Sequence, residues 1–422
     1  MSARNVWFIG CGAVVFLVLM SAGILFLYWT APPDVPVPPL STPPNNAYPA
    51  YLQLVEKTRQ LEASTSNVGT LSERAMQRGA STSDLRQLVA AYQPIRREYR
   101  KLRGKPSVVT DWDSMHATMQ AGSVLRTWAR VEAADIEVAF REGDHARAID
   151  DLRTILLLTE NIRRGGTFMR YLVGEAMIVI VTAVFSDGLE KLSPVECDRV
   201  VQVIREWEQV RVPFWQALEG EKRFTIAVCH AMHEGGERTA RMYGAPPHAG
   251  PPRYAGRMFN LRAAAREAAR LYDKAIAEAK KPLLQRRLPG VTPKHPLNQA
   301  LLSTVFNRAS DKSAISVARL RLLACAAAVR AYRLRHGHYP RTLAEAGIAD
   351  LNKDPITGGE FVYHTGAKGF LLYSVGVDGK DDGGKRVVES RIFEARGDIS
   401  PVRYAVPKAS ATTPPGPAVW LR

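Results

Sequence analysis

The chain has 422 residues, of which 46% are hydrophobic, and carries 57 Lys+Arg against 41 Asp+Glu, a formal net charge of +16. This length accommodates roughly two or three domains of ordinary size. The hydrophobic fraction is that of a globular protein, which excludes a wholly disordered chain. The excess of positive charge indicates anionic neighbours such as lipid headgroups or cell-wall polymers.

The N-terminal segment is apolar and uncharged from Val6 to Trp29. At about 1.5 Å per residue, such a helix can cross a hydrocarbon core roughly 30 Å thick. Trp7 stands at one end and Tyr28-Trp29 at the other, where amphipathic rings favour the membrane interface. We therefore predict that residues 1–30 form a single transmembrane anchor.

A cleaved signal peptide is the alternative interpretation of this segment. Its apolar region would span about 7 to 15 residues and end in a small-residue cleavage site. Here the run is longer, and the bulky residues 25–29 occupy the position of that site. We expect the anchor to remain uncleaved, with the membrane lipid bilayer as its partner.

The orientation follows from the distribution of basic residues. Arg4 and the free amine precede the apolar run, and no Lys or Arg follows it until Lys57. The positive-inside rule then leaves the N-terminus in the cytoplasm. This predicts a single-pass protein of the inner (cytoplasmic) membrane with the bulk of the chain exported, so nucleic acid is not expected as a partner.

Residues 31–48 are rich in proline and contain three Pro-Pro pairs. We predict an extended, semi-rigid polyproline linker that holds the folded part away from the bilayer. The next region, residues 49–288, shows helical periodicity and is expected to be one helical domain. Within it, residues 83–102 read as an amphipathic helix with Ser83 as its N-cap, and Ser193-Pro194 opens another helix.

A helical hairpin is predicted from residues 119–140 and 145–162, joined at Gly143-Asp144. The pair resembles a tetratricopeptide hairpin, because Ala148 and Leu152 fall at small and large packing positions of its second helix. The aromatic and Leu-Gly positions of the first helix are missing, and no second copy follows at a period of about 34 residues. A tetratricopeptide-like middle region is therefore the finer alternative to a plain helical one.

Residues 172–185 are very apolar but contain Glu175 and number too few to span a membrane, so we expect a buried core helix. His230, His233 and Glu234 form a short polar cluster whose ordinary interpretation is helix surface rather than a metal site. Four cysteines, Cys11, Cys197, Cys229 and Cys325, fit no zinc or redox motif. We expect buried free thiols, although an exported compartment also permits a disulfide.

A linker is predicted over residues 289–311, a small α+β domain over residues 312–407 and a disordered tail over residues 408–422. The α+β domain begins with a helix over residues 313–336 that ends at Gly337, followed by a short helix near Leu343. Two strand-like runs, residues 360–364 and 370–375, flank a hairpin signal. The fold class is therefore mostly α with a small C-terminal α+β domain.

The order of motifs in this last region resembles the globular domain of the major pseudopilins of type II secretion systems. The motifs are Gly337-His338-Tyr339-Pro340, Asp354-Pro355-Ile356-Thr357-Gly358, Tyr363 and Tyr373-Ser374-Val375-Gly376-Val377-Asp378-Gly379. The resemblance covers roughly a fifth of the chain. The N-terminal helix lacks a prepilin cleavage motif, so a filament subunit is not expected; the whole chain looks like a bacterial membrane-anchored envelope protein.

The resemblance also implies calcium binding, because related pseudopilins hold calcium in the corresponding loop. Here that loop contains Asp378, Asp381 and Asp382, and Asp398 matches the aspartate that closes it. Calcium takes six to eight oxygen ligands, which carboxylates and loop carbonyls supply. A solvated turn rich in Asp and Gly is the alternative, and Lys380 weakens the local negative charge.

Catalytic motifs such as GxSxG, a Walker A loop or a Rossmann fingerprint are missing from the sequence. The predicted function is therefore a membrane-anchored interaction or scaffold protein of the cell envelope, with an envelope protein as its unidentified partner. The alternative is an envelope hydrolase whose site lies between the helical and C-terminal domains. An enzyme requires a pocket with convergent polar groups, which a scaffold does not.

Overall fold

The computed structural model describes residues 18–23, 25–64, 80–243, 259–286, 293–302, 305–366, 369–385 and 397–401. The fold is mostly helical, at 67%, with a small two-stranded antiparallel sheet near the C-terminus. This confirms the predicted fold class at that level. The predicted tail, residues 408–422, lies outside the described residues.

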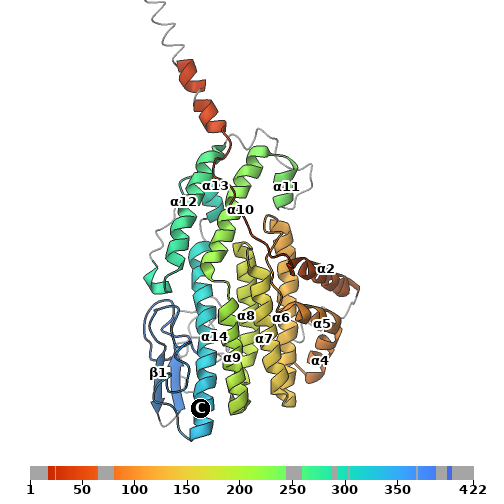
Figure 1. Cartoon of the computed structure of the whole chain (residues 1–422), viewed down its shortest axis with the longest axis vertical. Helices are drawn as coiled ribbons and strands as arrows, with labels where there is room; N and C mark the ends of the chain where they lie inside the picture. The colour runs from red at the N-terminus through yellow and green to blue at the C-terminus, as the bar shows by residue number, and fades with distance from the viewer. Residues whose placement is uncertain are drawn as a thin grey trace, which may run out of the picture.

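Long helices that run up and down beside one another form the centre of the body (Figure 1). They are α6 (Met115–Glu142), α7 (His145–Arg163), α8 (Phe168–Asp187), α9 (Pro194–Val210), α10 (Phe214–Glu234) and α14 (Val305–His336). The last of these packs against α8 and α9, although a long stretch of sequence separates it from them. Local hairpins therefore build most of the bundle, and one distant helix completes it.

Shorter helices cover the two flanks of this bundle (Figure 1). They are α2 (Tyr48–Ser64), α4 (Thr82–Ala91), α5 (Gln93–Leu102), α11 (Glu237–Tyr243), α12 (Leu261–Ala279), α13 (Pro296–Leu302) and the 3₁₀ turns η1 (Leu189–Lys191) and η4 (Leu283–Gln285). The first three pack on α6 and α7, and α12 packs along α10. The end of the body formed by α12 and α13 is the end at which the N-terminal helix enters.

The segment predicted as one helix over residues 83–102 is two helices, α4 and α5. Tyr92 separates them, and Pro94 lies in the first turn of α5, where a missing N–H costs nothing. The N-cap of α4 is Ser81, not Ser83: the Ser81 hydroxyl accepts a 3.0 Å hydrogen bond from the Asp84 N–H. The extended backbone of Ser81 suits a cap, whereas Ser83 already lies inside the helix.

The predicted hairpin is confirmed as α6 and α7. Gly143 ends α6 in the left-handed conformation with φ 78°, and the Asp144 side chain caps α7 through the Arg147 N–H. The two helices have 28 and 19 residues, so together they exceed a tetratricopeptide unit of about 34 residues. The prediction at Ser193-Pro194 is also correct, because Ser193 and Glu196 form a capping box at the start of α9.

Helix α8 is the helix in the described residues that is long and apolar enough to span a membrane, yet 67% of that apolar stretch is buried inside the protein. It packs against α6, α7, α10 and α14. A Cβ on Gly174 would lie 2.8 Å from Thr159 Cγ2, so the glycine permits close approach of α7. The prediction of a core helix over residues 172–185 agrees with this packing.

Glu175 is a charged residue buried near the middle of α8, with a side chain only 1% exposed; Arg170, at the start of the helix, is buried as well. Arg163 Nη1 of α7 donates to Glu175 Oε1 at 2.9 Å, and Arg163 also pairs with Glu160. Burial raises the pKa of Glu175, and the guanidinium of Arg163 opposes that rise. Glu160 further accepts hydrogen bonds from Trp207 Nε1 at 2.5 Å and from the Val212 N–H at 2.7 Å. One arginine thus ties α7 to α8, while Glu160 extends the network to α9.

The hydrophobic core is continuous between the helical region and the C-terminal region. A single cluster of buried side chains includes Met177 of α8, Leu322 of α14, and Leu343 and Phe370 beyond it. The boundary predicted at residue 312 lies inside α14, which begins its described part at Val305. The described residues on the two sides of that boundary therefore pack as one body.

The C-terminal hairpin consists of β1 (Val362–Gly366) and β2 (Gly369–Tyr373), with Val362 opposite Tyr373. The predicted strand-like runs agree with it to within two residues at each end. Residues 341–347 form turns instead of the short helix predicted near Leu343. The Thr342 hydroxyl and the Glu345 side chain cap this turn as they would a helix, but Gly347, with φ 74°, ends it after one turn.

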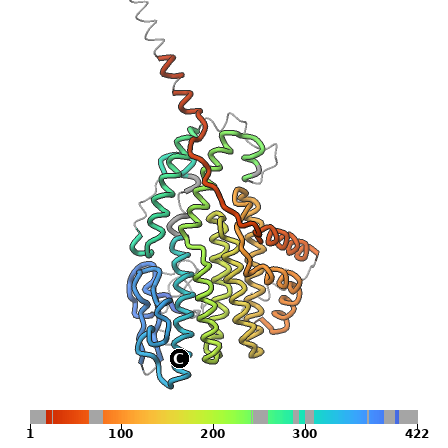
Figure 2. The backbone as a smooth tube through the Cα atoms, in the orientation of Figure 1, coloured from red at the N-terminus to blue at the C-terminus, as the bar shows by residue number. Residues whose placement is uncertain are grey.

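The proline-rich segment is extended, as predicted, but it lies on the body instead of acting as a spacer (Figure 2). Arg223 Nε donates to Pro38 O at 3.0 Å, and His230 Nε2 donates to Val35 O at 2.9 Å. Both donors belong to α10, and the backbone carbonyls that face them cannot be satisfied within a polyproline segment itself. We call residues 31–46 the strap.

We predict that Arg163→Met lowers the free energy of unfolding by about 3–5 kcal/mol, because it leaves Glu160 and Glu175 buried without their cation. Arg153→Met on the same helix is the matched control: its partner is Glu206, and both side chains are about a third exposed. The control should cost less than about 1 kcal/mol. Urea unfolding of the detergent-solubilised full chain, followed by circular dichroism, measures both, and equal losses would contradict the role of Arg163.

Candidate functional site

The loop that follows β2 contains the aspartates predicted to bind calcium. It begins at Gly376, with φ 71°, where an added Cβ would lie 2.0 Å from Gly397 O. The backbone of Ser374 pairs with that of Ile399 in both directions, at 2.9 and 2.8 Å. Two segments distant in sequence therefore meet at the base of this loop, and only glycine fits their closest approach.

The structure places the four aspartates in different surroundings. Asp378 Oδ1 accepts from the Lys380 N–H at 3.2 Å, and Asp381 Oδ1 accepts from Tyr373 Oη at 2.9 Å and from the Gly383 N–H at 2.8 Å. Asp398 Oδ2 accepts from the Gly384 N–H at 2.7 Å. The first three aspartates are exposed, whereas Asp398 is 2% exposed. Asp398 thus hydrogen-bonds to the end of the loop through the Gly384 N–H, while its role as a calcium ligand stays a prediction.

Asp398 is poised for a further partner. Its second oxygen, Oδ1, is buried and has no hydrogen-bond partner among the described residues. Burial raises its pKa to about 6; N–H groups of Gly384 and Asp382 oppose the rise, and the carboxylates of Asp381 and Asp382 add to it. A buried carboxylate oxygen without a donor is one feature of a calcium ligand, although the oxygens of the described loop aspartates do not all lie within 4.8 Å of one another. Asp378 hydrogen-bonds within its own turn and contributes less to this geometry.

A second acidic group meets the geometry of a metal site more closely. Glu132 and Asp135 of α6 and Asp151 of α7 are buried, and each has a carboxylate oxygen within 4.8 Å of the others. In the described part of the chain this is the acidic group with that property; the loop aspartates do not share it. Its members lie on two helices, and their spacing in the sequence matches no metal-binding motif.

The cation in this group is Arg96 of α5. Its Nη2 lies 2.6 Å from Asp135, 2.9 Å from Glu132 and 3.4 Å from Asp151. Arg100, one turn later, also pairs with Glu132, at 2.8 Å, and with Asp151. The guanidinium groups occupy the space that a metal ion would need, so we interpret this cluster as an ion network that joins α5, α6 and α7.

The pKa values of two carboxyls in this network, Asp151 and Glu132, shift in opposite directions. Burial, followed by the carboxylates of Glu132 and Asp135, raises the pKa of Asp151, and its Oδ2 has no hydrogen-bond partner among the described residues. The pKa of Glu132 is lowered, because Arg96 and Arg100 outweigh its burial. Asp150 adds a further carboxylate to the network, because it pairs with Arg100 at 2.8 Å.

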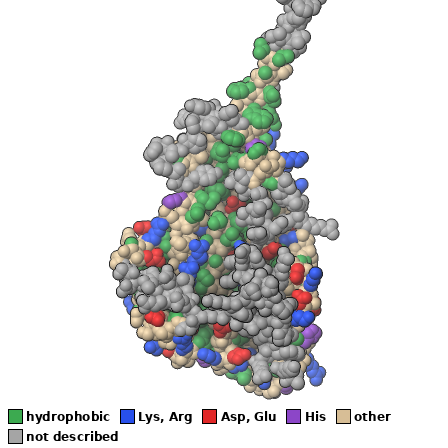
Figure 3. Space-filling view, turned by 180° about the vertical axis from the view of Figure 1, so that it is seen from behind, with side chains coloured by type: hydrophobic (Ala, Val, Ile, Leu, Met, Phe, Trp, Pro, Cys, Tyr) green, Lys and Arg blue, Asp and Glu red, His purple; other side chains and the backbone are tan. Residues whose placement is uncertain are grey.

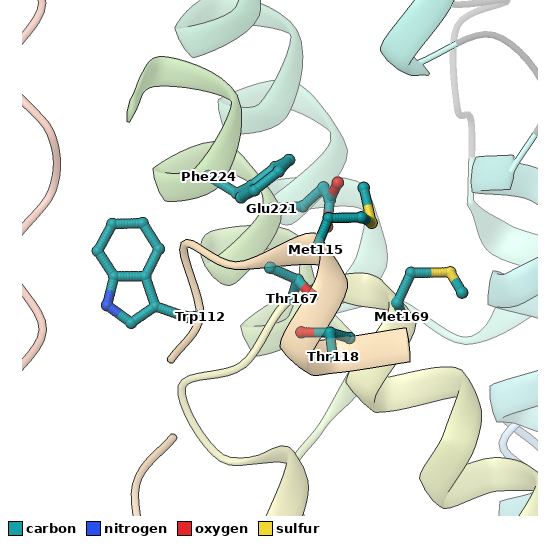
Figure 4. Close-up of a pocket in the computed structure, with 7 residues that line it drawn as sticks. All are labelled: Trp112, Met115, Thr118, Thr167, Met169, Glu221 and Phe224. Atoms are coloured by element: carbon teal, nitrogen blue, oxygen red, sulfur yellow. The ribbon is translucent and has the colours of Figure 1, made fainter. Parts of the chain in front are cut away.

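A small cavity lies at the starts of α6 and α8, beside α10 (Figure 4). Its empty space of about 200 Å³ includes open solvent, and the part that solvent can occupy has room for about one water molecule. The lining residues are Trp112, Met115, Thr118, Thr167, Met169, Glu221 and Phe224. Aromatic and methionine side chains dominate this lining, so the cavity is mostly apolar.

Glu221 is the ionisable group of the cavity. Burial raises its pKa to about 7, and the Phe168 N–H at the start of α8, which donates to its Oε2 at 2.9 Å, opposes the rise. The buried Thr118 hydroxyl has no hydrogen-bond partner in the described part of the chain. A carboxyl with a pKa near neutrality can exchange a proton; the other polar groups of the lining are the hydroxyls of Thr118 and Thr167, and Glu221 is its one ionisable group.

The remaining candidate residues have structural partners. His230 donates to the strap, and Glu234 pairs with Arg238 at 2.8 Å, so both residues have partners within the protein. Cys197, Cys229 and Cys325 are buried free thiols, as expected, whereas Cys11 lies outside the described residues. Burial raises the pKa of the Cys197 thiol to about 11, which keeps it protonated and unreactive.

The N-terminal apolar segment is helical where it is described, from Val18 to Thr30 apart from residue 24. Its large side chains are exposed, among them Leu19 at 65%, Leu27 at 69% and Trp29 at 46%. The helix stands clear of the body as an apolar surface (Figure 3). Such an exposed apolar surface is unfavourable in water and indicates a site of membrane or protein contact.

Comparisons with known proteins return no match: no family model, no curated protein and no solved structure is similar to this chain.

We predict that Asp398→Asn stabilises the calcium-free protein at neutral pH. The folded-state pKa of about 6 exceeds the ordinary value of 3.8, so the wild-type protein loses stability as pH rises between these values. Asparagine carries no charge, so the variant should gain about 1–3 kcal/mol over the wild type at pH 7.5 and little at pH 4.

Thermal melting in chelator across this pH range measures the effect. Asp378→Asn, at an exposed position of the same loop, is the control and should shift the melting curve little at either pH. If Asp398→Asn instead lowers stability at pH 7.5, the fold requires the ionised carboxylate. The unpaired charge is then not a cost that a bound cation would relieve.

Proposed function

We propose that this chain is a single-pass, membrane-anchored interaction or scaffold protein of the cell envelope. Residues 1–30 hold it in the inner (cytoplasmic) membrane, and the helical body is exported. The observation that carries the proposal is the contrast between two apolar helices. The helix over residues 18–30 exposes its large side chains, whereas α8 buries its own inside the body.

The pairing of buried charged residues between helices supports the interaction role. Its buried charges, such as Arg96 with Glu132 and Arg163 with Glu175, pair with one another across helices instead of converging on an open pocket. The cavity between α6, α8 and α10 is small and mostly apolar. Long helices stabilised in this way present a rigid surface, which suits an envelope protein partner.

The C-terminal region is proposed to share the pseudopilin-like fold and to bind calcium through Asp381, Asp382 and Asp398, with Asp378 nearby. The unsatisfied oxygen of Asp398 and its raised pKa support this assignment. Calcium bound there would join the loop to the segment at Asp398 and so hold the end of the sheet in place. The ion would neutralise the carboxylates and order the loop, and it would take no part in a reaction.

The alternative function, an envelope hydrolase, has one observation in its favour. Glu221, with its pKa near 7, has the property of a general acid or base. Its cavity lies within the helical region, however, and not at the junction between the helical and C-terminal parts. At that junction the N–H groups of Leu283 and Leu284 donate hydrogen bonds to the carbonyls of Pro355 and Ile356, so the two parts are in direct backbone contact there.

We predict that the anchor is retained and that the body is exported. Mass measurement of the mature protein should place its N-terminus at Met1 or Ser2, because the apolar run lacks a small-residue cleavage site. A reporter active only after export should function when fused after Pro49. An N-terminus near residue 31, or an active cytoplasmic reporter at that position, would contradict the proposed topology.

We also predict that calcium raises the melting temperature of the full chain by several degrees relative to chelator. Binding to the folded state alone contributes about 2.7 kcal/mol at a hundredfold excess over Kd. The full chain is the correct sample because α14 belongs to the common core. Asp398→Ala should abolish the shift, and magnesium should replace calcium poorly. Identical melting in calcium and chelator would remove the metal assignment.

A further inference from the structure

We propose that the body rests directly on anionic lipid headgroups through its membrane-proximal end. The contacting surface, which we call the basal face, consists of Phe259, Arg262, Arg266 and Lys294. This inference rests on the proposed membrane anchorage and adds to it a second, peripheral contact. The strap, the start of α12 and the start of α13 together position the four residues.

The strap fixes the distance between the anchor and α12. Thr30 ends the described anchor helix, and two residues later Pro32 O accepts a 3.0 Å hydrogen bond from Arg262 Nε. Asp34 then pairs with Arg266 and lies 3.7 Å from Arg262. The first turns of α12 therefore lie next to the point at which the chain leaves the membrane (Figure 1).

Phe259 is an exposed aromatic residue held at this point. It is 50% exposed, although most other large apolar residues of the body are buried. Asn260 after it adopts a left-handed conformation, with φ 45°, and caps α12 through the Ala263 N–H. His295 Nε2 donates to Phe259 O at 2.5 Å. These bonds fix the backbone so that the ring points outward, and aromatic rings favour the membrane interface.

The charges around Phe259 complement an anionic surface. Arg262 and Arg266, whose side chains are 26% and 51% exposed, share the single carboxylate of Asp34. Lys294 is exposed, and Glu267 nearby accepts the N–H groups of Lys294 and His295. Three basic side chains thus face the two carboxylates of Asp34 and Glu267, so the cluster retains a net positive charge. Guanidinium groups bind phosphate oxygens well, and basic residues next to a span favour anionic lipids.

Space-filling representation agrees with this arrangement: basic side chains lie on the body beside the base of the apolar anchor helix (Figure 3). The opposite end of the molecule offers a matched reference. Val195 at the start of α9 is 61% exposed, and Arg335 at the end of α14 pairs with Asp198. That end also carries an exposed apolar residue and a partnered arginine, but it lies far from the anchor (Figure 1).

The test places a fluorophore at each end of the full chain reconstituted into vesicles. In a Cys11→Ser background, Phe259→Cys or Val195→Cys is labelled with nitrobenzoxadiazole, while the three buried thiols remain protected. Lipids carrying a doxyl quencher report contact with the bilayer. We expect several-fold stronger quenching at position 259 than at position 195, and stronger quenching in phosphatidylglycerol vesicles than in phosphatidylcholine vesicles.

Charge variants separate lipid contact from strap binding. Lys294→Gln leaves the bonds between α12 and the strap intact and should reduce the difference between the two vesicle types. Arg262→Gln with Arg266→Gln should reduce it further, whereas Arg335→Gln at the far end should leave it unchanged. If Lys294→Gln and the double variant both leave the difference unchanged, headgroup recognition by this face is wrong.

Failure of the anchorage and failure of this inference give different results. If the chain does not float with the vesicles, the proposed anchorage itself fails. If it floats but the label at position 259 is quenched no more than the label at position 195, the anchor holds and the basal face does not touch lipid. Equal quenching in neutral and anionic vesicles would also overturn the proposal, because the contact would then not recognise charge.

Discussion

The ion network centred on Arg163 decides where the most apolar helix of the body lies. Helix α8 has the length and composition of a membrane span, but Glu175 makes insertion into lipid unfavourable unless its charge is compensated. Arg163 compensates it from α7 and binds Glu160 as well. The Arg163–Glu175 pair forms only when α7 and α8 pack side by side, so it favours the buried position of α8 between its neighbouring helices.

With α8 in the core, the N-terminal helix becomes the exposed apolar helix of the described chain, and the strap acquires its role. The strap hydrogen-bonds to α10 and α12 on one side and continues into the anchor on the other. The body is therefore tied to its anchor at one end and does not hang from a flexible linker. Under the proposed anchorage, these contacts give the body a fixed orientation relative to the N-terminal helix.

Short sequence signals predicted the local structure correctly. Contacts between residues far apart in the chain could not be predicted from them. Gly143-Asp144 and Ser193-Pro194 act within one turn, so the hairpin and the start of α9 were predicted correctly. The network of Arg96 with Glu132 was missed, because its members lie on different helices and each reads as surface charge alone. The strap was misread for the same reason: proline content predicts an extended backbone, but Arg223 and His230, far along the chain, decide what it contacts. The closure of the aspartate loop by Asp398 was predicted through family resemblance, not through any local pattern.

The most direct test of this account is alkaline carbonate extraction of membranes that contain either the full chain or a chain lacking residues 1–30. Carbonate releases peripheral proteins and retains those with a membrane span. If α8 belongs to the core and the N-terminal helix is the anchor, the full chain should stay in the membrane pellet and the shortened chain should be released in folded form. Retention of the shortened chain after carbonate treatment would mean that α8 or another segment enters the bilayer, and would contradict the central role of the Arg163 network.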